Sequence, residues 1–375
     1  MKRFVCLLLL LMCSTICTAA EDDDGAKYDA ARNKAREYLF SILQPDRAWE
    51  PPEKDNPLAT ASQAWGPSAL AALALAKNGE DPANDPRFAN AVDLIAKGTT
   101  KGVYALGLRL QLLNHPVFKG KYKAAVNADF RLLLTGMNKN GTFHYTVGQK
   151  TFDLSTTYFG WCGLMELKAA IPETAWRAIA TQLLSTQLQG GKAPVGYARP
   201  GEAAVPAGGW NYTLNDTRPP TIAMTGEALT LLLNAKANIR DRQMKDAIDA
   251  AVKRGLDYLD AAAEAAMKKG SVNPYTWLVL QRTGPLASRQ QFGAEDWMVD
   301  GITHFIKVQR PNGSFAQPSD TAMALLFMAI GDNDTPAGPP PLPAQVAPPT
   351  PETPTTPKTP TTGPRRLAPP RPAAH

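Results

Sequence analysis

Cysteine is scarce in this chain of 375 residues, and the positions of the few cysteines are informative. Three of the four, Cys6, Cys13 and Cys17, fall within the first 20 residues, which leaves Cys162 alone in the rest of the chain. A single cysteine cannot form an intramolecular disulfide, even in an oxidising compartment. We therefore expect the folded part to be stabilised by packing.

The chain also lacks long apolar runs and a strong net charge on its central part. Beyond residue 12, no segment offers the roughly 20 uncharged apolar residues that a membrane-spanning helix needs. The formal charge of +6 includes two charges near the N-terminus and a net three after Asp334, which leaves about +1 on the residues between. This near-neutral balance argues against a surface for nucleic acid.

The first 20 residues have the three parts of a secretory signal peptide. Residues 2–3 are basic, residues 4–12 are apolar, and Thr18-Ala19-Ala20 offers a small-residue cleavage site. We predict cleavage near Ala20 and export to the periplasm, the cell envelope or the medium. A lipid anchor on Cys13 or Cys17 is the alternative, but neither cysteine follows a small residue as a lipobox would require.

Residues 335–375 differ sharply in composition from the rest. They hold fifteen of the 33 prolines, interleaved with threonine. Such a segment cannot pack into a core, and we expect a disordered, extended, polyproline-rich tail. It can serve as a spacer that contacts cell-envelope material, as an O-glycosylated stalk, or have no partner.

The segment Asp296–Ile330 shows the pattern that recurs between the first 20 residues and the tail: an amphipathic helix, a turn and an apolar helix. Its first half repeats apolar residues at the spacing of an amphipathic helix. Pro311-Asn312-Gly313 ends that helix with turn residues. Ser319 or Asp320 can cap a second helix, Thr321–Ile330, which is apolar almost all round and is therefore expected to be buried.

Six such helical hairpins are predicted within residues 21–334. The other five pair an amphipathic with an apolar helix at 26–43 and 67–76, 87–97 and 102–113, 122–134 and 155–170, 173–188 and 222–235, and 241–269 and 273–282. Because each apolar helix must be buried by its neighbours, the pattern is typical of helical repeats. The predicted fold is an all-α, α/α toroid with the apolar helices inside. An open solenoid is the alternative.

The turns carry a recurring motif. Gln309–Phe315 (QRPNGSF) looks like the Gln-x-x-x-Gly-x-Trp repeat of terpene cyclases, with Phe in place of Trp. Partial copies occur at Met137–Phe143, at Gln44–Trp49, and at Gln187–Gly191 with Trp210. The chain thus resembles the prenyltransferase and squalene oxidase repeat proteins, and the resemblance implies an α/α toroid. Physically, such a motif bonds free backbone groups at a helix end, so its role is structural.

The catalytic signatures of that superfamily are missing. A cyclase-type Asp-x-Asp-Asp acid is absent from the folded region, since Asp22–Asp24 lies beside the cleavage site. Protein prenyltransferases hold zinc with an Asp two residues before a Cys, whereas Gly160 stands two residues before Cys162. The Gly-Cys-Gly-Glu-Gln of thioester domains is absent as well. We expect no metal and no cofactor, and Cys162 to be a buried, small apolar residue.

Candidate site residues remain at the turns and inner-helix ends, which converge on one mouth of a toroid. The candidates for catalysis are His144, Tyr145, Asp153 and Glu227. The candidates for ligand binding are Tyr158, Trp210, Tyr212, Asp216, Tyr275 and Asp320. His144 and Asp153 can form an acid–base pair, although Asp153 and Asp320 also fit the role of helix N-caps. The loop Gly190–Pro220 is a candidate binding loop.

Three functions follow from these observations. The leading hypothesis is a non-catalytic binding or scaffold protein whose cavity or loop holds an apolar (isoprenoid) or glycan ligand. The second is an enzyme, either a toroidal polysaccharide lyase or hydrolase or a diverged terpenoid cyclase. The third is a purely structural envelope protein that is anchored through its tail.

Overall fold

A computed structural model describes residues 25–52, 63–188, 207–213 and 219–329. All of them belong to one compact unit, Met1–Pro339, and a second unit comprises Pro340–His375. The described residues are mostly helical, as predicted, and include one antiparallel pair of short strands, β1 (Gln291–Phe292) and β2 (Glu295–Asp296). The predictions of a signal peptide at residues 1–20 and of a tail at residues 335–375 fall outside the described residues.

Helices of two kinds alternate along the chain. Most residues of the first kind are buried: α2 (Gly66–Lys77), α4 (Val103–Leu113), α6 (Leu154–Met165), α8 (Ile222–Asn238), α10 (Pro274–Leu286) and α12 (Pro318–Phe327). The second kind buries one face: residues 25–41, α3 (Pro86–Lys97), α5 (Lys123–Gly136), α7 (Glu173–Thr186), α9 (Arg242–Lys268) and α11 (Trp297–Val308). Short 3₁₀ helices follow α4 and α6 at Pro116–Phe118 and Lys168–Ala170. The two kinds of helix therefore follow one another along the chain in the order that the sequence predicts.

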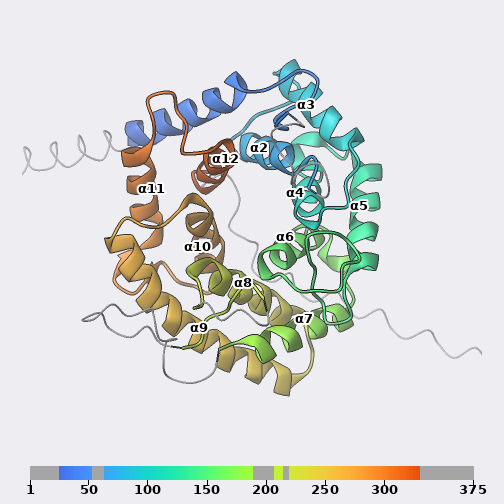
Figure 1. Cartoon of the computed structure of the whole chain (residues 1–375), viewed down its shortest axis with the longest axis vertical. Coiled ribbons are helices and arrows are strands. Elements are labelled where there is room, and N and C mark those ends of the chain that lie inside the picture. Colours follow the sequence, from blue (N-terminus) through green and yellow to red (C-terminus); the bar gives the residue numbers. More distant parts are fainter. Residues whose placement is uncertain (1–24, 53–62, 189–206, 214–218, 330–375) are drawn as a thin grey trace, which may run out of the picture. The chain divides into compact units, whose positions relative to one another are not determined.

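The two kinds occupy different positions within the unit. The even-numbered helices lie inside and the odd-numbered helices lie outside (Figure 1). Each inner helix contacts the next one along the chain, from α2 to α12, and α12 contacts α2 in turn. The apolar helices thus bury one another, as their composition requires. None of the described helices is long and apolar enough to cross a membrane.

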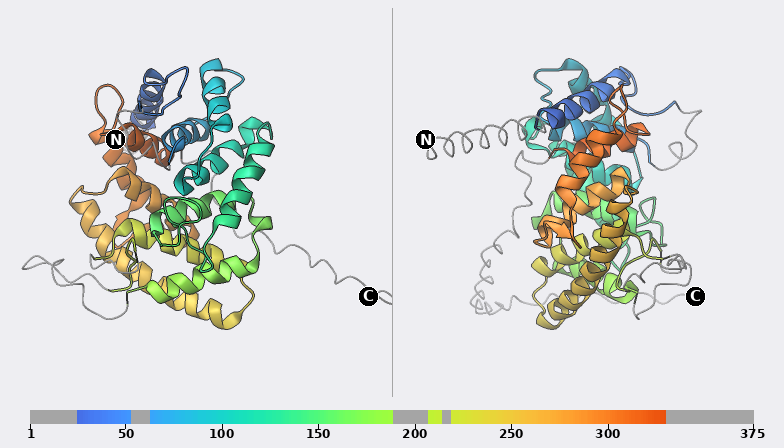
Figure 2. Two further views of the ribbon diagram at one scale, coloured as in Figure 1. Left: turned by 45° about the vertical axis from the view of Figure 1, so that its right-hand side comes forward. Right: turned by 90° about the vertical axis from the view of Figure 1, so that its left-hand side faces the viewer.

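Two segments distant in sequence meet where the last hairpin adjoins the first. The helix at residues 25–41 lies beside α11 and α12 (Figure 2). The side chain of Asn78 donates to the carbonyl oxygen of Leu325 at 2.8 Å, and the hydroxyl of Tyr28 donates to the carbonyl oxygen of Met328. These bonds join the two ends of the helical array.

The turn motif at Gln187 and Trp210 bonds backbone groups at a helix end, which is the structural role that the sequence predicts. Gln187 Nε2 donates to the carbonyl oxygen of Gly208 at 2.7 Å, between α7 and α8, and to that of Ala251 at 2.8 Å, on α9 of the next hairpin. The indole N–H of Trp210 donates to the carbonyl oxygen of Leu183 at 2.8 Å, at the end of α7. Amide and indole together therefore satisfy backbone groups that a helix end leaves free.

Helix caps confirm one predicted role and correct another. Asp153 is the N-cap of α6 and accepts a hydrogen bond from the backbone N–H of Thr156 at 2.8 Å. The N-cap of α12 is Gln317, so the prediction that Ser319 or Asp320 occupies this position is wrong. Asp320 instead stands three residues inside the helix, where its carboxylate accepts from the backbone N–H of Gln317 at 3.1 Å and completes a capping box.

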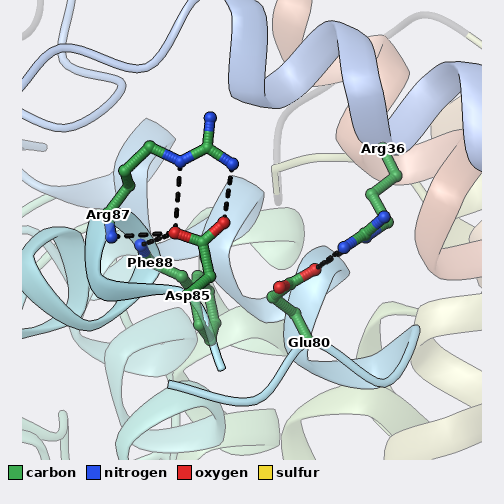
Figure 3. A network of polar contacts seen from close by, with 5 residues as sticks. All are labelled: Arg36, Glu80, Asp85, Arg87 and Phe88. Carbon is green, nitrogen blue, oxygen red and sulfur yellow. Dashed lines mark hydrogen bonds and ion pairs between the residues drawn. The ribbon is translucent and has the colours of Figure 1, made fainter. Parts of the chain in front are cut away.

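The loop between α2 and α3 is held by two polar contacts (Figure 3). Asp85 caps α3 by accepting from the backbone N–H groups of Arg87 at 2.8 Å and Phe88 at 3.3 Å. Arg36, on the helix at residues 25–41, forms an ion pair with Glu80 at 2.6 Å. The ion pair ties this loop to the helix at residues 25–41, and the cap sets the start of α3.

Candidate functional site

Arg282 reaches from α10 to two other inner helices. Its Nη1 lies 3.5 Å from the hydroxyl of Tyr158 and 3.6 Å from Sγ of Cys162, both on α6. Its Nη2 donates to Oε1 of Gln111, on α4, at 3.3 Å. All three partners are uncharged groups. Within the described ranges, no carboxylate forms an ion pair with this half-buried guanidinium.

Helix geometry brings these groups together. Tyr158 and Cys162 are four residues apart on α6, and therefore share one face of the helix. Tyr275 and Arg282 are seven residues apart on α10, which is close to two full turns. The faces that carry them are turned toward each other across the inner helices, since Arg282 contacts residues 120 and 171 positions away.

None of the direct partners of Arg282 carries a carboxylate. Burial lowers the pKa of Arg282, but Tyr158 and Cys162 raise it, and the balance lies above the ordinary value. The charge of Glu166 also acts on the guanidinium and raises its pKa. Burial raises the pKa of Tyr158, and it raises that of Cys162 to about 11. Both partners are therefore neutral at physiological pH, while Arg282 is charged.

Glu227 on α8 is the acidic group of this cluster. Its side chain is fully buried, and its Oε1 accepts a hydrogen bond from the hydroxyl of Tyr275. Its Oε2 is buried without a hydrogen-bond partner. Burial, and after it the charge of Asp153, raises the pKa of Glu227 well above the ordinary value, with partial compensation by Arg282. This carboxyl group therefore keeps its proton to a higher pH than an exposed glutamate does.

Aromatic rings lie beside the polar groups. Phe159 packs edge-to-face against Tyr104 on α4, with 4.6 Å between ring centroids, and stacks on Tyr275 at 6.0 Å with 15° between planes. Tyr158 packs against Phe159 in turn at 5.7 Å. The rings of Tyr104 and Tyr275 are half-buried. The same inner helices thus offer an apolar wall next to a fixed positive charge.

Three of the residues predicted from sequence belong to this cluster. They are Tyr158, Glu227 and Tyr275. Asp153 caps α6 and acts on Glu227 through its charge. Trp210 is 1% exposed and bonded to a helix end, which is a structural role.

The rings of His144 and Tyr145 pack edge-to-face against each other, with 4.9 Å between their centroids. Nδ1 of His144 lies 2.7 Å from Oε1 of Gln149, and the side-chain hydrogen bonds of Asp153 go to Ser155 and Thr156. The structure therefore places His144 and Asp153 in separate hydrogen-bonded groups. The side chain of Tyr145 is 49% exposed.

The remaining candidates divide between structural roles and residues outside the described ranges. The carbonyl oxygen of Tyr212 accepts from the backbone N–H of Leu154 at 2.8 Å, and Asp320 belongs to the capping box of α12. Asp216 and most of the loop 190–220 lie outside the described residues.

Sequence reasoning overlooked Arg282 and Gln111. Each is a polar residue inside an otherwise apolar helix, in PYTWLVLQRTGPL and VYALGLRLQLL respectively. A charged or amide side chain in a helix that is apolar all round has to find partners inside the fold. The position of these two polar side chains within mostly apolar helices was therefore the feature of the sequence that could have identified them. Within the described ranges, no group of three or more His, Cys, Asp or Glu is placed to hold a metal ion.

Comparison with known proteins identifies no relative of this chain. A scan against models of known protein families found no match, and a search of curated proteins found none.

Proposed function

We propose that this is an exported, non-catalytic binding protein, built as a closed α/α toroid of six hairpins of the prenyltransferase and squalene oxidase repeat kind. Its inner helices hold a ligand that combines an anionic group with an apolar or ring-shaped body. The contact between α12 and α2 supports a closed ring over an open solenoid. The bond from Gln309 to Ala31, which joins the last hairpin to the first, supports it as well.

The observation that carries the proposal is the environment of Arg282. Removing a guanidinium from water costs free energy unless a counter-charge or well-aligned acceptors compensate. The three partners of Arg282 are neutral, at 3.3 to 3.6 Å, which is longer than a charge-assisted hydrogen bond. An anionic ligand group supplies the missing counter-charge, and a guanidinium binds phosphate or carboxylate with two parallel hydrogen bonds.

The body of the ligand is inferred from the neighbouring rings. The half-buried faces of Tyr104 and Tyr275, joined through Phe159, suit an isoprenoid chain or the apolar face of a sugar. Together with the charge at Arg282, this environment favours an isoprenoid phosphate or an acidic glycan over a neutral molecule of either class.

The test begins with the mature protein as it is exported. A native mass spectrum, followed by extraction and identification, reports what remains bound. Thermal unfolding is then measured with farnesyl monophosphate, farnesol, an acidic oligosaccharide and a neutral oligosaccharide. A ligand that binds only the folded state raises the midpoint in proportion to its affinity. We expect one anionic probe to stabilise the protein more than its neutral counterpart.

Matched variants assign that effect to the inner helices. Arg282→Gln should remove the difference between the anionic and the neutral probe. Arg131→Gln changes an exposed arginine on α5, whose Nε bonds to the carbonyl oxygen of Asn127, and should preserve the difference. An equal response of the Arg282→Gln variant and the wild type would overturn the proposed site.

A second function, an enzyme of the diverged-cyclase type, is favoured by Glu227. A buried carboxyl group with a raised pKa can act as a general acid, and the hydroxyl of Tyr275 orients it. Under this alternative, Glu227→Gln abolishes turnover of a polyprenyl substrate and leaves its binding intact. Turnover that survives the substitution would remove Glu227 as the acid.

A further inference from the structure

A separate pocket lies between the outer helices α3 and α5. It has a volume of about 650 Å³, within the range of small-molecule sites. The C-terminal end of α3, the link from Gly98 to Lys101, and one face of α5 form its walls. Its small apolar residues include Ala125 and Ala128. None of the residues of the Arg282 cluster lines it.

A buried ion pair forms part of the lining. Nε of Arg109 on α4 lies 3.0 Å from Oδ2 of Asp129 on α5, and the two residues are 3% and 7% exposed. The guanidinium also donates to the carbonyl oxygens of Gly98 and Ala96, at the end of α3. Arg109 is therefore held in place by two hydrogen bonds at the end of α3 and by the ion pair with Asp129.

Asp129 is left incompletely bonded. Its Oδ2 is buried and makes no well-aligned hydrogen bond, and in the described ranges its carboxylate accepts no N–H or O–H donor other than the ion-pair contact. Burial raises the pKa of Asp129, and Arg109 opposes that change. The large majority of buried side-chain polar atoms in folded proteins have at least one hydrogen-bond partner. This carboxylate lines the pocket, where a ligand can donate a hydrogen bond to it.

The rim of the pocket is positively charged. Lys97 and Lys101 line it, together with the hydroxyl-bearing residues Thr99, Thr100 and Thr146. With Arg109 paired to Asp129, the two lysines give the pocket a net positive charge. A concave site of one sign concentrates ligands of the opposite sign.

We propose that this pocket binds a monosaccharide that carries a negative charge, with its carboxylate or phosphate at Lys97 and Lys101 and a hydroxyl donating to Asp129. The apolar walls of alanine and leucine accommodate the carbon skeleton. The site is distinct from the inner-helix cluster, and its ligand is smaller.

Calorimetric titration of the full mature chain tests the proposal. The probes are glucuronate, glucose 6-phosphate, glucose and inorganic phosphate. At least one of the two charged sugars should bind on the order of tenfold more tightly than glucose, because the rim charges add to the hydroxyl contact. The same charged sugar should also bind more tightly than inorganic phosphate, which lacks the hydroxyl groups of the sugar ring. The preferred anion distinguishes a sugar acid from a sugar phosphate.

Exposed lysines allow a variant that leaves the buried pair intact. The double substitution Lys97→Gln and Lys101→Gln should reduce the affinity for the charged sugar to near that of glucose. The same change at Lys34 and Lys307, which lie outside the pocket, should leave it unchanged. Arg282→Gln should also leave the affinity for the charged sugar unchanged. The proposals for this pocket and for the inner-helix site are therefore tested separately.

A third variant examines the hydroxyl contact. Asp129→Asn should weaken the binding of both glucose and the charged sugar. Far-UV circular dichroism checks that the variant is folded. Equal affinity of wild type and rim variant, equal affinity for glucose and the charged sugars, or absence of binding at millimolar concentration would each overturn the proposal.

Discussion

The side-chain amide of Gln309 donates to the carbonyl oxygen of Ala31 at 2.8 Å, although the two residues are 278 positions apart. The same amide donates to the carbonyl oxygen of Gly313 at 3.0 Å. Gln187 makes the equivalent pair of bonds, one to Gly208 within its own hairpin and one to Ala251 on the next hairpin. The glutamine of the turn motif thus joins neighbouring hairpins, and Gln309 joins the last to the first.

Replacing Gln309 by Ala should weaken this junction. Two carbonyl groups lose their donor, and each loss costs about 0.5–1.5 kcal/mol. We therefore expect the free energy of unfolding to fall by about 1–3 kcal/mol, measured by urea denaturation followed by circular dichroism. Gln243→Ala, at an exposed position on α9, should change it by less than about 0.5 kcal/mol. Similar losses in both variants would contradict the role of Gln309.

The fold was predictable where one local pattern decides the outcome. Apolar residues all round predict the buried helices α4 and α8, and one-sided patterns predict α3 and α11. Helix ends were harder to predict. α12 begins at Pro318 because Gln317 and Asp320 bond to each other's backbone, which a search for a single Asp or Ser cap does not reveal. The short strands β1 and β2 carry no alternating pattern at all.

The candidate site was predictable in part, for a similar reason. Glu227 and Tyr275 stand out as polar groups on apolar helices, and the structure joins them. The contacts of Arg282 depend on which helices face each other, and its partners Gln111 and Cys162 lie 171 and 120 residues away. Periodicity within one helix does not contain that information.

Gly107 should not tolerate a larger residue. A Cβ at this position of α4 would lie 2.0 Å from the carbonyl oxygen of Phe159 on α6, and Gly163 packs against the same place. Gly107→Ala would force the two inner helices apart, at a cost of about 1–3 kcal/mol in the free energy of unfolding. Gly25→Ala meets no atom within 4 Å and serves as the control. Equal unfolding midpoints for the two variants would contradict this close helix contact.

Glu227 should make stability depend on pH. Its pKa in the folded protein lies above the ordinary value of 4.5, mainly because of burial. Between these two values the native state keeps a proton that the unfolded chain releases, so the free energy of unfolding falls as pH rises, by at most about 1.4 kcal/mol per unit. Glu227→Gln carries no titrating group and should flatten this slope.

The measurement for Glu227 is a series of urea denaturations from acidic to neutral pH. Asp129 and Asp300 also have raised pKa values and contribute slopes of the same sign, so the informative quantity is the difference between variant and wild type. A difference that is constant with pH would show that Glu227 titrates at an ordinary value in the folded protein.

Cys162 should be unreactive until the protein unfolds. Its side chain is 7% exposed, and burial raises the pKa of the thiol to about 11. Since the thiolate is the reactive form, both access and ionisation are suppressed at pH 8. In protein lacking residues 1–20, which contains no other cysteine, iodoacetamide should label the native state slowly and the urea-unfolded state rapidly. The Arg282→Gln variant removes the cation beside the sulfur and should make native labelling slower still. Rapid labelling of the native wild type would mean that the inner helices open around Cys162 on the time scale of the reaction.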